Sequence, residues 1–261
     1  MAFAEKQIKI VEKVRRLSFA DFDKIELSRG GVAIIANLFL NPDCITDVNL
    51  ESYLKYKTVK LSDISRHIIT AAPATLAAYA QSHNKLYLDR DDIVECFVLD
   101  HLQTLADNKI DKFKGCIYAL AHTMSQATVR SVREDDAVFI VELEQGDLVY
   151  QNVIVPMSLE VKKGQLVWHH FGVVVDIASA ADERIYNKQQ ADSYWQEIYN
   201  TAGKKNIDFT DKNIFGKNIY KRILQELHRR SCDYYENKIS QSEIDRVVCN
   251  NSQINKIRLT N

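Results

Sequence analysis

The period of the hydrophobic pattern changes near residue 123, and this change constrains the fold more than any other feature of the sequence. Before it, apolar residues recur every three or four positions, as on the buried side of amphipathic helices. After it, four stretches rich in Val, Ile, Phe and Tyr have the character of strands, at 127–132, 137–143, 148–159 and 166–177. Their connections are short, and short connections join antiparallel neighbours. We therefore predict a central antiparallel meander of three or four strands.

The predicted fold class is α+β, with a helical N-terminal half, the central meander and a helical C-terminal part packed on it. Residues 1–122 form the helical region, and residues 123–261 hold the antiparallel sheet with the C-terminal helices. A chain of 261 residues fits either two small domains or one continuous domain, so both arrangements stay open. The run at 173–175 is Val throughout and therefore apolar on both faces, which places this last strand inside the sheet.

Glycines and acids are expected to mark helix boundaries in the first half of the chain. Gly30 and Gly31 are expected to break the chain before a short, nearly all-apolar helix at 32–40. The acid-rich residues 89–92 are expected to begin a long helix that runs past Leu102. The reason is that carboxylates stabilise the positive N-terminal end of a helix.

The balance of charge excludes several classes of protein. Lys and Arg number 34 and Asp and Glu 35, so the net charge of −1 argues against a protein that coats nucleic acid or a membrane surface along its whole length. A local basic patch is compatible with that balance. No apolar run approaches the roughly 18 residues that a membrane span needs, and the N-terminus is too charged for a signal peptide.

The cysteines are an odd, widely spaced set without a Cys-x-x-Cys pair. They are Cys44, Cys96, Cys116, Cys232 and Cys249. Such a set is typical of reduced thiols in the cytoplasm. We therefore expect a cytoplasmic protein without disulfides and without membrane association.

The sharpest catalytic candidate combines Asp147 with Glu160 and Lys162. A carboxylate at the start of one strand, followed by Glu-x-Lys, resembles the pattern of the PD-(D/E)XK nucleases. This resemblance implies that Asp147 and Glu160 bind Mg²⁺ or Mn²⁺, as hard oxygen ligands for a hard cation, and that Lys162 orients or deprotonates the attacking water. The sequence departs from that family at 163–165, which indicates a turn into another strand instead of a helix. The alternative is that these side chains line a solvated sheet edge and its turn.

Histidine spacing does not predict a zinc site. His169 and His170 are neighbours in a predicted strand, so their side chains point to opposite faces and do not readily share a metal. We expect one of them to be buried with a hydrogen bond and the other to be exposed. The remaining histidines lack the His-x-x-x-His and Cys/His spacings of metal sites. They are His67, His83, His101, His122 and His228. Outside the nuclease alternative, the sequence therefore indicates no cofactor.

Charge is distributed unevenly along the second half of the chain. Residues 134–147 carry six acids and no base, whereas residues 204–230 carry eight bases against three acids. The bases taken as candidate nucleic-acid or partner-binding residues are Lys204, Lys205, Lys217, Lys221, Arg222, Arg229 and Arg230. Tyrosines and Phe209 are interleaved with them, which is typical of surfaces that track a nucleic-acid backbone. The alternatives are a solvated helix face, or an internal match between this basic segment and the acidic stretch.

Two functions from different classes remain open. The first is a non-catalytic binding or assembly protein that contacts nucleic acid or an acidic protein partner through residues 204–230. The second is a metal-dependent nuclease centred on Asp147, Glu160 and Lys162. The sequence contains none of the common nucleotide-binding or hydrolase motifs. If the protein is an enzyme of another kind, its site is assembled from residues that are scattered along the sequence. Neither the substrate nor the oligomeric state follows from the sequence.

Overall fold

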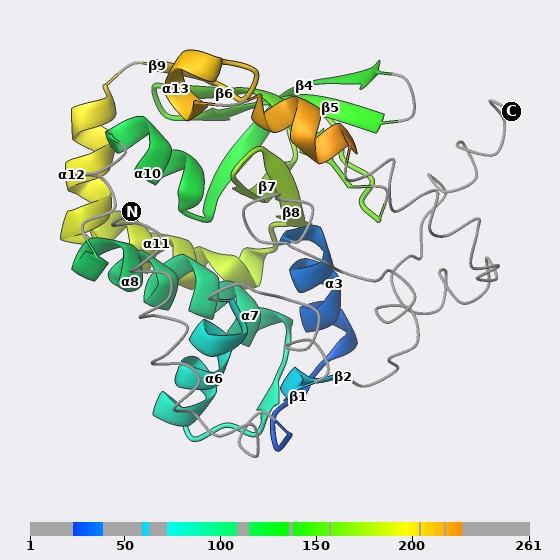
Figure 1. Ribbon diagram of the computed structural model, residues 1–261, viewed down its shortest axis with the longest axis vertical. Coiled ribbons are helices and arrows are strands. Elements are labelled where there is room, and N and C mark those ends of the chain that lie inside the picture. Colours follow the sequence, from blue (N-terminus) through cyan, green and yellow to red (C-terminus); the bar gives the residue numbers. More distant parts are fainter. Residues whose placement is uncertain are drawn as a thin grey trace, which may run out of the picture.

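The structure is a computed structural model that describes most of the chain between residues 23 and 225. The described ranges are 23–38, 59–62, 72–108, 115–135, 138–156, 158–203, 205–216 and 218–225. Figure 1 shows a strand-rich part at the top of the view and a mainly helical part at the bottom.

Five strands close into a small barrel. They are β4 (Ser125–Asp135), β5 (Val138–Gln145), β6 (Leu148–Val155), β7 (Leu166–His170) and β8 (Val173–Ile177). β4 pairs with β5 and β7, β5 with β6, and β7 with β8, all antiparallel. A parallel contact between Ile154 of β6 and Val173 of β8 completes the ring. A further strand, β9 (Lys205–Asp208), pairs parallel with the first half of β6 and extends the sheet beyond the ring.

The prediction of one antiparallel meander is therefore wrong. β7 returns to pair with β4 instead of β6, and the pairings of β6 with β8 and β9 are parallel. The predicted strand at 166–177 is in fact two strands, because the chain reverses at Phe171 and Gly172. The sequence pattern merged them since Phe171 is apolar and continues the hydrophobic run. Val173 does lie inside the sheet, with a neighbouring strand on each side.

The prediction of a helical N-terminal half is also wrong, because this half contains a second sheet. Its helices are α3 (Arg29–Leu38), α6 (Ala72–Ser82), α7 (Arg90–Glu95), α8 (His101–Asn108) and α10 (Cys116–His122), and a π-helical turn, η1 (Cys96–Asp100), joins α7 to α8. The sheet has the order β2-β1-β3, and its strands are β1 (Glu26–Leu27), β2 (Val59–Lys60) and β3 (Tyr87–Leu88). Strands of two residues are too short to produce an alternating pattern in the sequence.

Gly30 and Gly31 lie inside α3 instead of breaking the chain before it. Ser28 caps this helix, since its hydroxyl accepts a hydrogen bond from the Gly31 amide at 3.0 Å. Both glycines permit a close contact with α7. A Cβ atom at Gly31 would lie 3.0 Å from Ile93, and one at Gly30 would lie 3.2 Å from Arg90. The expected break is thus a helix–helix contact that has no room for larger side chains.

The acids at 89–92 begin α7 as expected. Asp89 accepts a hydrogen bond from the Asp92 amide at 3.0 Å, and Asp92 accepts one from the Asp89 amide at 3.1 Å, which makes a reciprocal capping box. The helix does not continue evenly, because the His101 amide donates to the Cys96 carbonyl at the end of η1. A π turn inserts an extra residue, so the side chains after it point in a direction that helical spacing does not predict.

The C-terminal part covers one end and one side of the barrel (Figure 1). It consists of a 3₁₀ turn η2 (Ala180–Asp182), α11 (Glu183–Ala191), α12 (Ser193–Ala202), β9, α13 (Lys212–Phe215) and the helical residues 219–225. One hydrophobic core fills the barrel, and a second lies among α3, α6 and α7. β7 lies between the two cores, with Val167 in the first and Trp168 in the second. Within the described ranges, no helix combines the length and the apolar character needed to cross a membrane.

Candidate functional site

The three residues of the predicted nuclease site lie in a turn and in an irregular segment. Asp147 is exposed in the turn between β5 and β6, where its amide donates to the Tyr199 hydroxyl at 3.2 Å. Glu160 and Lys162 follow β6, with side chains 52% and 78% exposed and 4.0 Å apart. The turn expected after the lysine is present, since the Gln165 amide donates to the Lys162 carbonyl at 3.1 Å. The Glu-x-Lys pair is therefore not on a strand that would fix both side chains to one face.

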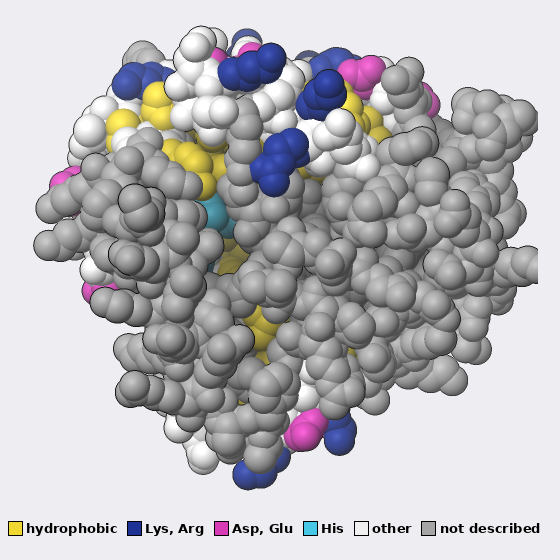
Figure 2. Space-filling view, viewed as in Figure 1, with side chains coloured by type: hydrophobic (Ala, Val, Ile, Leu, Met, Phe, Trp, Pro, Cys, Tyr) yellow, Lys and Arg dark blue, Asp and Glu magenta, His cyan; other side chains and the backbone are white. Residues whose placement is uncertain are grey.

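Part of the predicted binding segment lies within the described residues. Lys205 at the start of β9, Lys212 in α13 and Lys221 on the helical residues 219–225 are exposed, and Arg222 is partly exposed. These four residues are termed the basic surface. Figure 2 shows Lys and Arg side chains gathered over the part of the molecule where Figure 1 places β9, α13 and the helical residues drawn in orange. The predicted residues outside the described ranges are Lys204, Lys217, Arg229 and Arg230.

The acids of the same segment are engaged by local donors. Asp208 accepts hydrogen bonds from the Thr210 amide and hydroxyl, at 2.9 and 2.7 Å, and from the Asn152 side chain at 2.7 Å. Burial tends to raise the pKa of Asp208, but these donors outweigh it and hold the pKa below its usual value. Asp211 caps α13 by accepting from the Asn213 amide at 2.8 Å. Both carboxylates therefore serve the backbone of this segment.

Tyr220 joins the basic segment to the acidic stretch. It donates its hydroxyl to Asp135 at 2.8 Å, and Arg133 pairs with the same carboxylate at 3.2 Å. Glu142 of β5 pairs with Arg130 of β4, also at 3.2 Å. In the described ranges, the ion pairs of these β4 and β5 acids are thus made by arginines of β4 and not by lysines of the basic surface.

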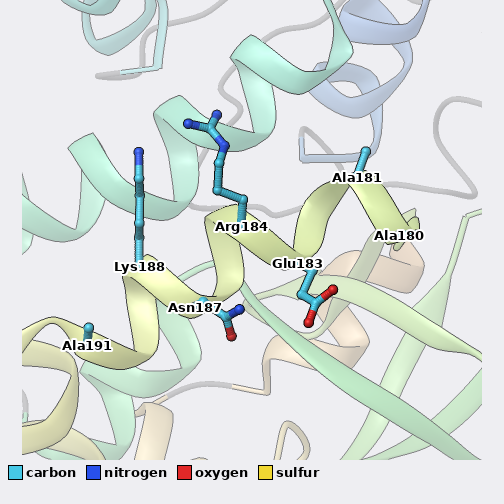
Figure 3. A pocket seen from close by; sticks show the side chains of 7 residues that line it. All are labelled: Ala180, Ala181, Glu183, Arg184, Asn187, Lys188 and Ala191. Carbon is cyan, nitrogen blue, oxygen red and sulfur yellow. The ribbon is translucent and has the colours of Figure 1, made fainter.

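A shallow pocket of about 660 Å³ runs along α11 (Figure 3). Arg184 and Lys188 point to one side of the helix, whereas Glu183 and Asn187 point to the other. Both cations pair with Glu95 at the end of α7, at 3.3 and 3.4 Å. The two cations of the pocket therefore serve the contact between α11 and α7.

Arg90, at the start of α7, ties the helical part to the barrel. Its guanidinium donates to Asp176 of β8 at 2.7 Å and to both carboxylate oxygens of Asp182, at 2.7 and 2.9 Å. Asp182 is fully buried, and it also accepts from the Trp168 indole at 2.9 Å and from the Ser179 amide at 2.8 Å. Burial tends to raise the pKa of Asp182, but these donors overcome it and hold the pKa below its usual value. A carboxylate fixed in its charged form suits a structural ion pair better than proton transfer.

Three histidines that are far apart in the sequence meet where helices cover the outside of β7. His101 begins α8, His122 ends α10 and His170 ends β7. One ring nitrogen of each lies within 4.8 Å of those of the other two. The ring centroids are 5.7 Å apart for His101 and His122, 5.2 Å for His122 and His170, and 6.3 Å for His101 and His170. Among the described His, Cys, Asp and Glu residues, these three form the one group close enough to share a metal ion. They are termed the histidine cluster.

Backbone geometry places the members of the histidine cluster. The Phe171 amide donates to the Ala121 carbonyl at 2.7 Å, and this bond brings the adjacent residues His170 and His122 together. Phe171 has a φ of +46°, which is uncommon for a residue with a side chain. His101 follows η1 directly, so the π turn sets the direction of its ring. Sequence reasoning missed the cluster because its members share no local spacing and come from two helices and a strand.

Aromatic rings pack around the histidine cluster. Tyr118 stacks on His122 with ring centroids 5.8 Å apart, and Phe171 meets the same ring edge-on at 5.3 Å. Burial lowers the pKa of His101 to about 4 and that of His170 well below its usual value. Both rings are therefore neutral near pH 7, and neutral imidazole is the form that binds a metal. His101 Nδ1 is buried and has no hydrogen-bond partner among the described residues.

His169 points to the other face of β7, into the barrel. Its Nε2 lies 3.1 Å from the Ser125 hydroxyl, and its ring packs 4.3 Å from that of Tyr150, measured between centroids. His169 and His170 are only 0% and 4% exposed, so the expectation that one of them is exposed is wrong. His170 is buried because helices pack on the outer face of β7. The hydrophobic pattern of a strand does not show whether its polar face is covered by another element.

Comparison with known proteins assigns no family or activity to this chain. It matches no protein-family model, and comparisons with curated proteins and with solved structures gave no significant match. Its function has to be argued from its own residues and their contacts.

Proposed function

We propose that the protein is a non-catalytic binding protein that holds the phosphate backbone of a nucleic acid on its basic surface. The observation that carries the proposal is the placement of Lys205, Lys212 and Lys221. They come from three successive elements, and all three are exposed. These elements lie in the part of the molecule over which Lys and Arg side chains gather in Figure 2. Lysine and arginine side chains neutralise phosphates and so supply the part of nucleic-acid binding that does not depend on base sequence.

In the described ranges, the acids near the basic surface make their contacts with local donors and not with its lysines. Asp208 and Asp211 accept from backbone amides of their own segment, and Asp135 is bridged by Arg133. Small five-stranded barrels also occur among oligonucleotide-binding domains. That likeness is one of architecture only and carries less weight than the side chains.

The cytoplasmic location expected from the cysteines is kept as part of the proposal. Cys96 and Cys116 lie in the described ranges, and both are free thiols. Free thiols are the usual state in a reducing compartment.

The test replaces the three lysines together, as Lys205→Glu, Lys212→Glu and Lys221→Glu. Binding of labelled single-stranded and duplex DNA and RNA is measured by fluorescence anisotropy over a series of salt concentrations. For the wild type we expect the affinity to fall steeply with salt. For duplex DNA the log–log slope changes by about 0.9 for each phosphate contact, so the triple variant should bind more weakly and give a flatter slope.

The matched control makes the same charge change elsewhere, at three exposed lysines outside the basic surface. These are Lys24, Lys60 and Lys163. Equal weakening by both triple variants would show a general effect of net charge and would contradict the proposal. Loss of an acidic protein partner from the basic-surface variant, with no binding of nucleic acid by the wild type, would identify that protein as the ligand instead.

No observation in the described ranges favours the nuclease alternative over this proposal. It remains a prediction with its own test. Asp147→Ala or Glu160→Ala should abolish any Mg²⁺- or Mn²⁺-dependent cleavage while leaving the melting temperature unchanged, since both side chains are exposed.

A further inference from the structure

We propose that His101, His122 and His170 bind one divalent transition-metal ion of the zinc type, with a fourth coordination position left for water or an added ligand. Each supplies one ring nitrogen, and these nitrogens lie within 4.8 Å of one another. The site shares no residue with the basic surface and does not depend on nucleic-acid binding.

The distances suit a site that closes around its metal. A tetrahedral zinc ion lies about 2.0–2.1 Å from each histidine nitrogen, which puts the nitrogens about 3.3–3.4 Å apart. Starting from separations of at most 4.8 Å, each nitrogen has to move less than about 1 Å towards the common centre. Small rotations of the three side chains provide that movement without a change of the backbone.

The donor set selects the class of metal. Three imidazole nitrogens suit zinc, cobalt, nickel and copper, whereas magnesium and calcium prefer oxygen ligands. The described residues place no carboxylate or thiolate in the group. His101 Nδ1 is also buried without a hydrogen-bond partner in the described ranges, and a bound ion is one of the few explanations for such a nitrogen.

The surrounding structure holds the ligands in place before metal binds. His122 packs against Tyr118 and Phe171, and the bond from the Phe171 amide to the Ala121 carbonyl fixes the neighbouring residues His170 and His122 relative to each other. Residues outside the ligand shell orient the histidine ligands of metal sites in this way. His101 follows the π turn η1, and π turns are rare features that occur frequently at functional sites.

Part of the site is accessible to solvent. His101 and His122 are partly exposed, whereas His170 is buried. Histidine atoms are visible on the face shown in Figure 2. The two partly exposed rings are the members of the cluster that an ion from solution would meet first.

The experiment uses the full-length protein, freed of any affinity tag and dialysed against a chelator. Co²⁺ is titrated in while the visible absorption is followed, and Zn²⁺ binding is then measured by calorimetry. We expect one ion per chain, the absorption of tetrahedral Co²⁺ and no sulfur-to-metal charge-transfer band. Zn²⁺ should also raise the melting temperature, since a ligand that binds the folded chain stabilises it.

Single variants then assign the ligands. His101→Gln or His122→Gln should weaken binding at least about 100-fold, because loss of a ligand costs more than the roughly 10–100-fold caused by loss of an outer-shell partner. The control is His83→Gln, at a histidine that is exposed on the described surface and lies outside the cluster. This variant should bind like the wild type.

Three outcomes would overturn the proposal. They are a wild type that binds neither Co²⁺ nor Zn²⁺ at equimolar concentration, a thiolate charge-transfer band in the Co²⁺ spectrum, and folded cluster variants that bind as the wild type does. If a cluster variant does not fold, the wild-type spectrum decides. Tetrahedral coordination of one ion without a thiolate ligand supports the site, and any other result rejects it.

Discussion

At the scale of single residues, the stability of the junction between barrel and helices depends on Asp182. This carboxylate is fully buried and accepts from Arg90, Trp168 and the Ser179 amide. Asp182→Asn keeps the shape of the side chain but leaves the Arg90 guanidinium poorly compensated. Breaking a buried ion pair costs about 3–5 kcal/mol, and urea unfolding should show a loss of about 3 kcal/mol, because Asp176 still pairs with Arg90. Asp91→Asn, which removes the exposed partner of Arg90, should cost less than about 1 kcal/mol.

Only local interactions of these residues could be predicted from the sequence. Asp89 and Asp92 form the expected cap, because a capping box spans three residues and depends on the local backbone alone. Arg90 lies in the same acid-rich run, and such a charged run is typical of a solvent-exposed segment. Its ion-pair partner Asp182 is 92 residues away in the sequence, so no local pattern predicts the pair. The histidine cluster was missed for the same reason, since no local pattern places His101 beside His170.

At the scale of elements, the two-residue turn between β7 and β8 is the feature that the hydrophobic pattern concealed. Gly172 has a φ of +86°, and a Cβ atom there would lie 3.0 Å from the Phe209 ring. Gly172→Ala should therefore cost about 2–3 kcal/mol, part from backbone strain and part from overpacking. The melting temperature should fall by about 4–12 °C, since each kcal/mol shifts it by about 2–4 °C in a chain of this size.

Gly164→Ala is the matched control for this prediction. Gly164 has a similar φ of +83°, but a Cβ atom there would meet nothing within 4 Å. It carries the backbone strain without the clash, so thermal unfolding should show a smaller fall in melting temperature. Equal falls in the two variants would mean that the contact with Phe209 does not matter. The sequence pattern missed this turn because Phe171 is buried in it, although turn residues are usually polar.

At the scale of the whole molecule, the order of the strands depends on contacts that no local pattern records. Four of the barrel strands begin within a few residues of their predicted positions, since their alternation is strong. The antiparallel pairs of β4 with β5 and of β5 with β6 follow from the short connections. The pairing of β7 with β4 and the parallel contact of Ile154 with Val173 could not be predicted, because they close the ring only after β7 and β8 have returned to it. The short strands β1 to β3 are likewise defined by pairing partners and not by composition.

The response of the whole chain to acid is set by carboxylates whose charged form is favoured by folding. The pKa of Asp182 is below its usual value, because donors overcome the effect of burial, and Asp208 is shifted in the same direction. As the pH falls, the unfolded chain takes up these protons first. The stabilisation is therefore complete above the unfolded value of about 3.9 and is lost as the pH falls through the folded values. Asp176 acts in the opposite sense, since burial raises its pKa despite Arg90.

We therefore expect the free energy of unfolding of the wild type to fall steeply below about pH 4. Asp182→Asn should lose less over the same range, because it has no proton to bind at this position. The difference between the two proteins, measured by urea unfolding at a series of pH values, should be constant near neutral pH and should shrink as Asp182 is protonated. Asp91→Asn provides the control at neutral pH, since it removes an exposed partner of Arg90 and leaves Asp182 in place. The difference in the free energy of unfolding between wild type and Asp182→Asn could instead stay constant to the lowest pH. That result would mean that the charge of the Arg90–Asp182 pair does not hold the barrel to the helices.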